Sequence, residues 1–244
     1  MTKKPTKQKR KPRKVAIVGK APNTIGLAPY DDPTWEIWTL SNNAQLGEAK
    51  RWDRHVEIHQ LSQIRDRPER KSYWEWLCSE PADGRPIYMQ EVLSAVPASK
   101  AFPKTAVVDV FGGYFNNTVS WMMALALLEG VTDLALYGIN MSCDGDGEDS
   151  EYAHQRPSCE YMIGWAMGMG VPVTLPSESD LLTVARLYGF DSEGNAGAAW
   201  RSRNKELAQR EMQAQQKYDE ALQHLCGLKG AREDWKHARK CHLG

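Results

Sequence analysis

The chain has 244 residues, a formal net charge of zero and five cysteines. This length suits one α/β domain with an appendage, and the lack of an apolar run of about 18 residues argues against a membrane span. The odd cysteine count, without a CxxC pair, indicates reduced thiols in a cytoplasmic protein.

The first segment, residues 1–14, is strongly basic. It carries eight lysines and arginines and no acid. Because it has almost nothing apolar to bury, we expect a disordered tail, and it lacks the apolar stretch of a secretory signal. Two interpretations stay open: a tail that only improves solubility, and a tail that binds DNA through its phosphates.

Residues 15–190 alternate between short apolar runs and helical patterns. Strands are predicted at 15–19, 35–40, 54–59, 86–89, 133–137 and 171–175. Helices are predicted at 70–78, 117–129 and 158–169, with Pro157 at the start of the last, whereas 94–115 shows no regular pattern. This order predicts an α/β fold with a mainly parallel, Rossmann-like sheet and helices on both faces.

The C-terminal part, residues 196–242, changes to a polar composition rich in Ala, Gln, Glu, Lys and Arg. We predict a long helix to about Leu225, a break at Gly227 and Gly230, and a shorter helix, so that the extension is one long helix or a helical hairpin. Its apolar stripe is narrow. Packing on the domain and pairing with a second copy in a homo-oligomer both stay open.

Two predicted strands, far apart in the chain, end in Gly19 and Gly138. In open α/β sheets, ligands bind at the carboxyl ends of the strands. The turn that starts at Gly19 is neither a GxGxxG motif nor a P-loop. Its backbone N–H groups can still hold a phosphate, helped by the side chains of Asn23 and Thr24. A purely structural tight turn is the alternative.

Ser41, Asn42 and Asn43 follow the second predicted strand. Asn amides offer a donor and an acceptor that suit ribose or a base edge, and helix capping is the alternative. With the turn before the helix at 117, these strand ends predict a nucleotide site. Its members are Gly19, Ala21, Pro22, Asn23, Thr24, Ser41, Asn42, Asn43, His59, Asn117, Thr118 and Asn140.

His55, Glu57 and His59 alternate along the third predicted strand and therefore share one face. Such a set is compatible with a metal site. The interpretation that we favour has His59 alone reaching the nucleotide site from the strand end, while His55 and Glu57 pair with neighbours.

The stretch at 140–161 has the highest concentration of side chains that can take part in chemistry. Its acidic first half lacks the bidentate Glu of a calcium loop, so we expect a mobile loop with at most weak Mg²⁺ contact. Its second half places Tyr152, His154 and Arg156 before a predicted helix. We predict these three as the catalytic residues, with His154 as a base and Tyr152 and Arg156 as partners of a phosphate.

Several of these features occur together in one known group. They are the turn at 15–24, the Asn after the second strand, the polar turn at 116–118, the strand at 134–140, His154 and the Pro-Ser end at 176–182. Together they resemble the family-42 bacterial sialyltransferases and the related DUF115 and archaeal pterin pyrophosphokinase-like proteins. Residues 151–160 also resemble uncharacterised proteins of tailed phages and prophages. The chain has Lys20 and Ala21 where the group has Asn-Gly.

The sialyltransferase resemblance implies transfer from a nucleotide sugar, with His154 as the base and Tyr152 and Arg156 near the phosphate. The pyrophosphokinase branch implies a nucleoside triphosphate and Mg²⁺. We therefore expect a nucleotide-dependent transferase, acting in phage DNA modification if the basic tail binds DNA. The alternative is a non-catalytic nucleotide-binding or interaction protein whose partner surface is the C-terminal helix.

Overall fold

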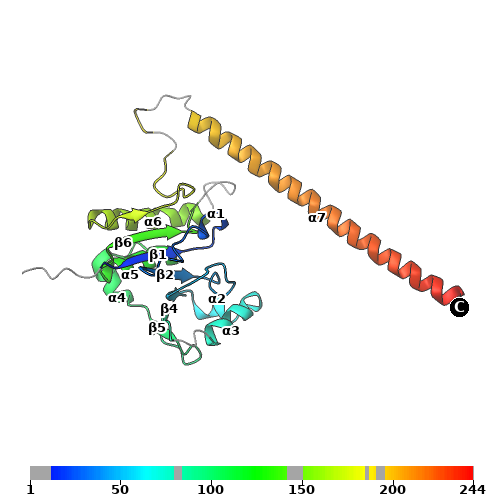
Figure 1. Ribbon diagram of the computed structural model, residues 1–244, viewed down its shortest axis with the longest axis horizontal. Coiled ribbons are helices and arrows are strands. Elements are labelled where there is room, and N and C mark those ends of the chain that lie inside the picture. Colours follow the sequence, from blue (N-terminus) through cyan, green and yellow to red (C-terminus); the bar gives the residue numbers. More distant parts are fainter. Residues whose placement is uncertain (1–11, 80–83, 142–150, 185–186, 191–195, 244) are drawn as a thin grey trace, which may run out of the picture. The chain divides into compact units, whose positions relative to one another are not determined.

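The computed structural model describes residues 12–79, 84–141, 151–184, 187–190 and 196–243 (Figure 1). These residues belong to two compact units. The first contains the sheet and ends at Thr183, before the predicted domain end at residue 190, and the second contains the C-terminal helix. Each unit is described by itself.

The described strands form a seven-stranded sheet in which every pair is parallel. They are β1 (Lys14–Val18), β2 (Trp35–Leu40), β3 (Arg54–Val56), β4 (Ile87–Met89), β5 (Ser99–Ala101), β6 (Asp133–Tyr137) and β7 (Val173–Thr174). The order β5-β4-β3-β2-β1-β6-β7 reverses direction between β1 and β6. The predicted α/β fold with a parallel, Rossmann-like sheet is therefore confirmed, and this reversal is where such sheets bind ligands.

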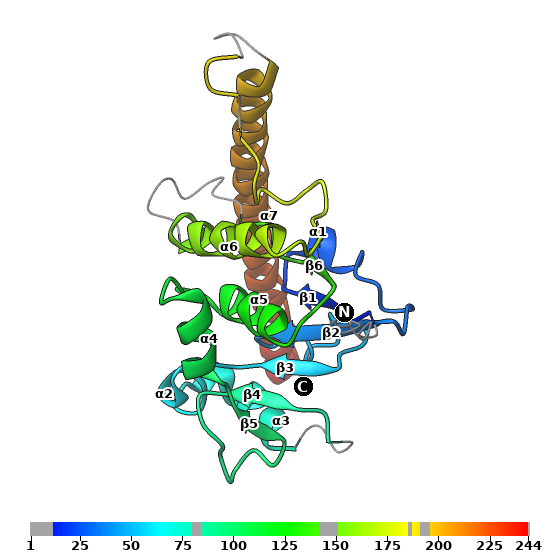
Figure 2. The same cartoon turned by 90° about the vertical axis from the view of Figure 1, so that its left-hand side faces the viewer.

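Helices cover both faces of the sheet. They are α1 (Pro22–Ile25), α2 (Leu61–Ile64), α3 (Lys71–Ser79, after the 3₁₀ turn η1 at Pro68–Arg70), α4 (Lys104–Phe111), α5 (Thr118–Leu128) and α6 (Glu151–Gly168). Figure 2 shows α4, α5 and α6 on one side of β1 and β2.

Alternation along β1 divides its side chains between two cores. Val15 and Ile17 pack with residues of α4, α5 and α6, whereas Ala16 and Val18 belong to a smaller core that includes Ala28 and the loop after α1. Since successive side chains of a strand point to opposite faces, this division follows directly from the strand period of two. A third cluster joins α2 and α3 to β4.

The segment at 94–115, where we predicted no regular structure, contains β5 and α4. β5 has only three residues, with one buried position, so it leaves little alternation to recognise. α4 starts after Pro103, which occupies its N-cap position, and ends at Gly112, whose φ is +79°. The prediction therefore missed a short edge strand and a two-turn helix.

Helix α6 begins at Glu151, before the predicted start at 158, and Pro157 lies inside it. A proline in a helix leaves its i−4 carbonyl without the usual partner and disturbs the neighbouring bonds. Here the carbonyls of His154 and Gln155 accept hydrogen bonds from the side chains of Asn116 and Asn117, at 2.5 and 3.0 Å. These bonds fasten the first turns of α6 to the segment before α5.

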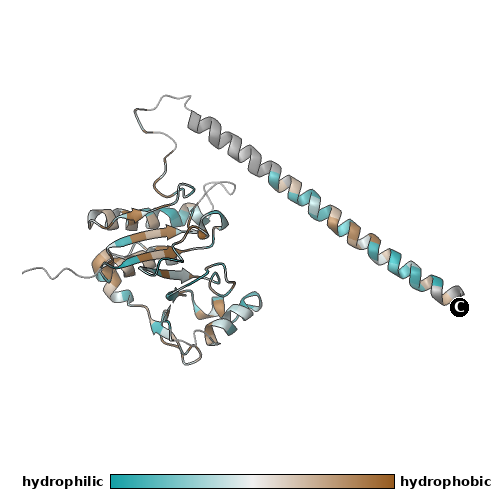
Figure 3. Cartoon of the chain, in the orientation of Figure 1, coloured by the Kyte–Doolittle hydropathy of each residue, from teal (hydrophilic) through white to brown (hydrophobic). Residues whose placement is uncertain are grey.

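The second unit contains α7 (Ala196–Leu243), which is one continuous helix. The predicted break at Gly227 and Gly230 is therefore wrong, since a glycine costs a helix only about 1 kcal/mol relative to alanine. Figure 3 shows apolar positions spaced along α7, and those with described side chains, such as Leu225 and Trp235, are exposed. Across the described residues, no helix has the length and apolarity needed to cross a membrane.

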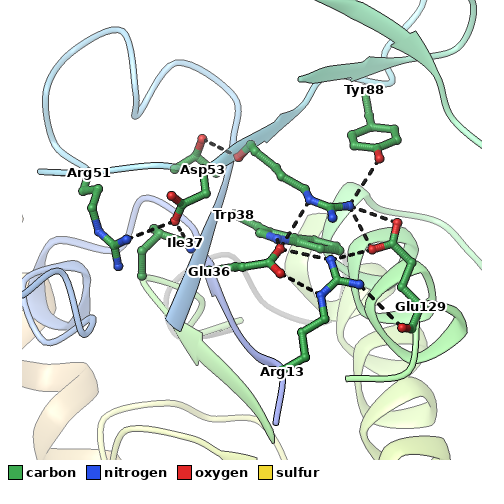
Figure 4. Close-up of polar contacts among 10 residues, drawn as sticks. Arg13, Glu36, Ile37, Trp38, Arg51, Asp53, Tyr88 and Glu129 are labelled. Carbon is green, nitrogen blue, oxygen red and sulfur yellow. Dashed lines mark hydrogen bonds and ion pairs between the residues drawn. The ribbon is translucent and has the colours of Figure 1, made fainter. Parts of the chain in front are cut away.

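The amino-terminal edge of the sheet is held by four charged side chains (Figure 4). Arg13, just before β1, pairs with Glu36 of β2 and with Glu129 at the end of α5, both at 2.7 Å. Arg54 of β3 pairs with Glu129 at 2.9 Å and with Glu36 at 3.4 Å. The basic tail predicted at 1–14 therefore ends before Arg13, because Arg13 and β1 belong to the folded domain.

Hydrogen bonds keep this network charged. Burial alone would raise the pKa of Glu36, but hydrogen bonds from Arg13 and Trp38 and the charges of Arg13 and Arg54 outweigh burial and lower it. The Arg54 guanidinium also lies 4.6 Å from the centre of the Trp38 ring, a cation–π distance. The four charges thus tie three strands and a helix together.

Candidate functional site

A cavity of about 810 Å³ opens at the carboxyl ends of β1, β2 and β6, next to the point where the strand order reverses. This volume is typical of a small-molecule or cofactor site. Residues from six segments line it: Gly19, Lys20, Ala21, Pro22, Leu40, Ser41, Ile58, His59, Phe115, Asn116, Asn117, Thr118, Val119, Trp121, Gly138, Ile139, Asn140, Met141, Glu151, Tyr152 and Gln155.

The two glycine-ended strands lie side by side at this cavity, as their sequence pattern indicated. The Gly19 amide donates to the Tyr137 carbonyl at 2.8 Å, and a Cβ added to Gly19 would lie 2.3 Å from the Gly138 oxygen. Gly138 itself has φ +64°. The backbones approach so closely that neither position has room for a side chain, and Gly138 also adopts a conformation that favours glycine.

Side chains of the turn after β1 are used to join it to β6. The buried Thr24 hydroxyl donates to Asn140 Oδ1 at 3.0 Å and accepts from the Gly138 amide at 2.9 Å. Asn140 Nδ2 donates to Asn23 Oδ1 at 2.8 Å. Thr24 and Asn23, predicted as direct nucleotide contacts, are outside the cavity lining, whereas Asn140 is part of it.

The residues after β2 divide into structural and accessible groups. The side chain of Asn43 is buried and donates to the carbonyls of Val18 and Gly19 at 2.7 and 3.1 Å, so it fastens this loop to β1. Asn42 accepts from Lys20 Nζ at 2.7 Å. Ser41 lines the cavity with a φ of +55°, which is uncommon for a residue with a side chain.

The amino-terminal end of α5 forms another part of the wall. Asn117 caps the helix by accepting from the Ser120 amide at 2.9 Å, while its Nδ2 donates to Ser158 Oγ of α6 at 2.8 Å. Thr118 and Val119 follow in the first turn and line the cavity. Because the first N–H groups of a helix lack intrahelical partners, this end favours a negatively charged group.

His59 lines the cavity from the segment after β3, which ends at Val56 and not at residue 59 as predicted. Its Nδ1 lies 2.5 Å from Glu57 Oε1, and its backbone N–H donates to the same oxygen at 3.1 Å. The hydrogen bond with Glu57 raises the pKa of His59 against the opposing effect of burial. Burial alone would raise the pKa of Glu57, but bonds from His59 outweigh it and lower the pKa.

His55 is fully buried, and its ring nitrogens lie 2.9 Å from Thr39 Oγ1 and 2.8 Å from the Tyr73 hydroxyl. Burial lowers the pKa of His55 to about 4. His55 and Glu57 thus pair with neighbours. Among the described residues, no three His, Cys, Asp or Glu side chains gather as a metal site would require, and the acidic stretch at 142–150 lies outside those residues.

The three predicted catalytic residues occupy different positions on α6. Tyr152 lines the cavity. His154 is exposed and is not among the lining residues, and Arg156 pairs with Glu160 at 2.7 Å and donates to the Thr183 carbonyl. On a helix, residues two apart point in different directions. The early start of α6 therefore separates side chains that a loop would have left free to converge.

Sequence reasoning missed the aromatic wall of the cavity. Phe115 and Trp121 stack with ring centres 4.0 Å apart and planes 20° apart, and Leu40 and Ile58 pack against the same core. Phe115 lies in the segment predicted as irregular, and Trp121 in an apolar helix. Only the tertiary contact shows that they form one surface, which suits an apolar or aromatic part of a ligand.

Comparisons of the chain with protein-family models, curated proteins and solved structures found no match. Its function is therefore inferred from its own residues.

Proposed function

We propose that the protein is a nucleotide-dependent transferase whose donor, a nucleotide sugar, binds in the cavity at the carboxyl ends of β1, β2 and β6. The observation that carries this proposal is the composition of the cavity at the strand-order reversal. It combines an apolar wall, a helix start and a cationic side chain in about 810 Å³. The planar base of a nucleotide matches the apolar wall, and its phosphate matches the helix start and the cationic side chain.

Each surface has a role in this proposal. Phe115 and Trp121 face the base, and the amino end of α5 together with Lys20 faces the phosphate. Lys20 is already oriented by its bond to Asn42. Tyr152 supplies a hydroxyl from α6, and the Mg²⁺ of the triphosphate alternative would have to come with the nucleotide.

A thermal-shift panel tests the donor class. The ligands are CMP, UDP, GDP and ATP, each alone and as a sugar nucleotide where one exists, with ATP also tested with Mg²⁺. A ligand at about 100 times its Kd stabilises the folded state by about 2.7 kcal/mol, which gives a readable rise in Tm. We expect one sugar nucleotide to shift Tm more than the others.

Matched lysine variants identify the site. Lys20→Met removes the cation of the cavity and should weaken binding by about tenfold or more. Lys100→Met makes the same change on the exposed edge strand β5 and should leave affinity unchanged. A shift by ATP with Mg²⁺ alone would favour the pyrophosphokinase-like function. The absence of any shift would overturn the proposal.

A second part of the proposal concerns the acceptor and the partners. If the basic segment binds phosphates, the acceptor is a modified base in phage DNA, and removing residues 1–11 should reduce DNA binding and flatten its salt dependence. Equal DNA binding by both forms at low salt would show that the segment only improves solubility.

For α7, we propose pairing with a second copy, which sedimentation at increasing protein concentration would reveal.

A further inference from the structure

A chain of hydrogen bonds runs from the core of the domain to the cavity. It begins at Thr39, passes through His55 and Tyr73, and reaches Glu57, whose Oε2 accepts from the Tyr73 hydroxyl at 2.8 Å. Tyr73, His55 and Glu57 are all essentially buried. A buried polar network is stable only when its members are satisfied, and here every link has a partner.

The direction of each bond can be assigned from chemistry. Burial is the main reason why the pKa of Tyr73 lies well above its usual value, so its hydroxyl keeps the proton that it donates to Glu57. The Tyr73 oxygen must then accept from Nε2–H of His55, which leaves Nδ1 of His55 to accept from Thr39. All donors in the chain therefore point toward the Glu57 carboxylate.

The same carboxylate sets the state of His59. A carboxylate can only accept, so Nδ1 of neutral His59 must carry the proton that bonds to Glu57 Oε1. The backbone N–H of His59 also donates to this oxygen and restrains the ring. Nε2 is then unprotonated, on a side chain that lines the cavity and is 45% exposed.

We propose that His59 is the base of this cavity and that Glu57, Tyr73 and His55 are positioning residues, which hold its ring with the proton on Nδ1 and the lone pair on Nε2. The proposal rests on the transferase function inferred above. A carboxylate behind a histidine sets the tautomer in the same way in many hydrolytic sites. What differs here is that the carboxylate is itself oriented by a buried tyrosine and a second histidine.

The transfer step balances as follows. The acceptor hydroxyl oxygen forms a bond to the anomeric carbon of the donor sugar, and its proton moves to Nε2 of His59. The bond between that carbon and the phosphate oxygen breaks, and its electron pair stays on the released nucleotide. The His59 imidazolium, stabilised by Glu57, then gives its extra proton to water.

Nitrogen chemical shifts of the imidazole rings test the tautomer in the full-length protein. With ¹⁵N-labelled histidine, the spectrum above the titration of His59 should show the proton on Nδ1, the minor form of a free histidine. His154 is the internal reference, because its exposed ring should show mainly the Nε2–H form. His59→Gln and His154→Gln assign the two signals. An Nε2–H form at His59 would overturn the proposal.

Two conservative variants separate positioning from mere packing. Glu57→Gln keeps the shape but removes the charge, and it should lower the titration midpoint of His59 by about one pH unit. Tyr73→Phe keeps the ring that stacks on Trp76 but removes the hydroxyl donor. The Glu57 charge then acts more strongly on His59, so the midpoint should rise. If Tyr73 has a purely structural role, the titration midpoint of His59 should not change in a folded variant. That result would show that Tyr73 is not part of the hydrogen-bond chain that positions His59.

The other charges that face His59 are Arg70 of η1 and Glu151 of α6, which lower and raise its pKa respectively. Glu151→Gln is thus the control for Glu57→Gln, because Glu151 acts on His59 through its charge alone. Its effect on the midpoint should be smaller, and an equal effect would show that charge alone sets the state of His59. The ¹⁵N spectrum of His59 is recorded without any nucleotide. It can therefore support the positioning of His59 even if the nucleotide panel contradicts the transferase proposal.

Discussion

The two ends of one parallel sheet use polar side chains in opposite ways. At the amino end, Arg13 and Arg54 face Glu36 and Glu129, and each charge is paired. At the carboxyl end, Lys20 and other polar groups surround an open cavity. Paired charges hold elements together, whereas polar groups that face a cavity remain available to a ligand.

At the carboxyl end, some polar side chains serve structure and others face the cavity. Its inner members, such as Asn43 and Thr24, are buried and bonded to backbone or side chains of neighbouring elements. Its outer members, such as His59, keep one side toward the cavity. Polar residues at a strand end are therefore of two kinds, and burial separates them.

The largest effect that we expect is on turnover, and it belongs to the carboxyl end. His59→Gln should reduce nucleotide release from the sugar nucleotide identified by the panel by about 10²–10⁴-fold, because a positioned base contributes that much to rate. Its free energy of unfolding should also fall, because the buried Glu57 loses the His59 ring as a partner, but the variant should remain folded. Product release followed by chromatography, together with urea unfolding, measures both.

His154→Gln is the matched histidine variant, and it tests the base predicted from the sequence. Since His154 is exposed and outside the cavity lining, we expect it to lose far less activity than His59→Gln. If the two losses are exchanged, His154 is the base and the assignment of His59 is wrong.

The amino end should show the reverse pattern. Arg54→Met removes a guanidinium that is 18% exposed and leaves Glu129 and Glu36 with fewer partners, so it should cost about 3 kcal/mol of stability. Ligand affinity of the folded variant should stay the same. Arg65→Met, which breaks an exposed pair with Asp66, should cost much less. Equal losses in urea unfolding would contradict the structural role of this end.

The contact between Gly19 and Gly138 brings stability to the carboxyl end as well. Gly138→Ala places a Cβ 2.7 Å from Gly19 backbone atoms, and it should cost about 2 kcal/mol more than Gly47→Ala. Gly47 also has a positive φ but meets nothing within 4 Å, so it accounts for the backbone strain alone. Similar losses in thermal unfolding would show that the close approach tolerates a methyl group.

The last effect depends on pH and comes from the buried His55. Because the folded pKa of His55 is about 4 and its ordinary value is 6.5, the unfolded chain binds more protons between these values. His55 therefore lowers stability as pH falls, by about 1.4 kcal/mol per pH unit within this window. His55→Gln should remove that slope. The raised pKa of His59 acts in the opposite direction in both proteins, so the difference between the two urea series reports His55.

Much of the scaffold was predictable from local patterns. β2 and β6 lie where apolar runs indicated, at Trp35–Leu40 and Asp133–Tyr137, because buried parallel strands are continuous apolar segments. The convergence of Gly19 and Gly138 was also anticipated, since both end such strands. β5, α4 and the start of α6 were not, because short elements and a helix that continues through proline depend on partners elsewhere in the chain.

For the candidate site, the residue types were recognisable but their roles were not. The sequence alone established the class of fold and the strand ends that carry polar groups, because both depend on local period and spacing. The tertiary structure decided which polar groups bond to neighbouring elements, such as Asn43, and which line the cavity. That distinction depends on burial and hydrogen-bond partners, which are set by segments distant in the chain.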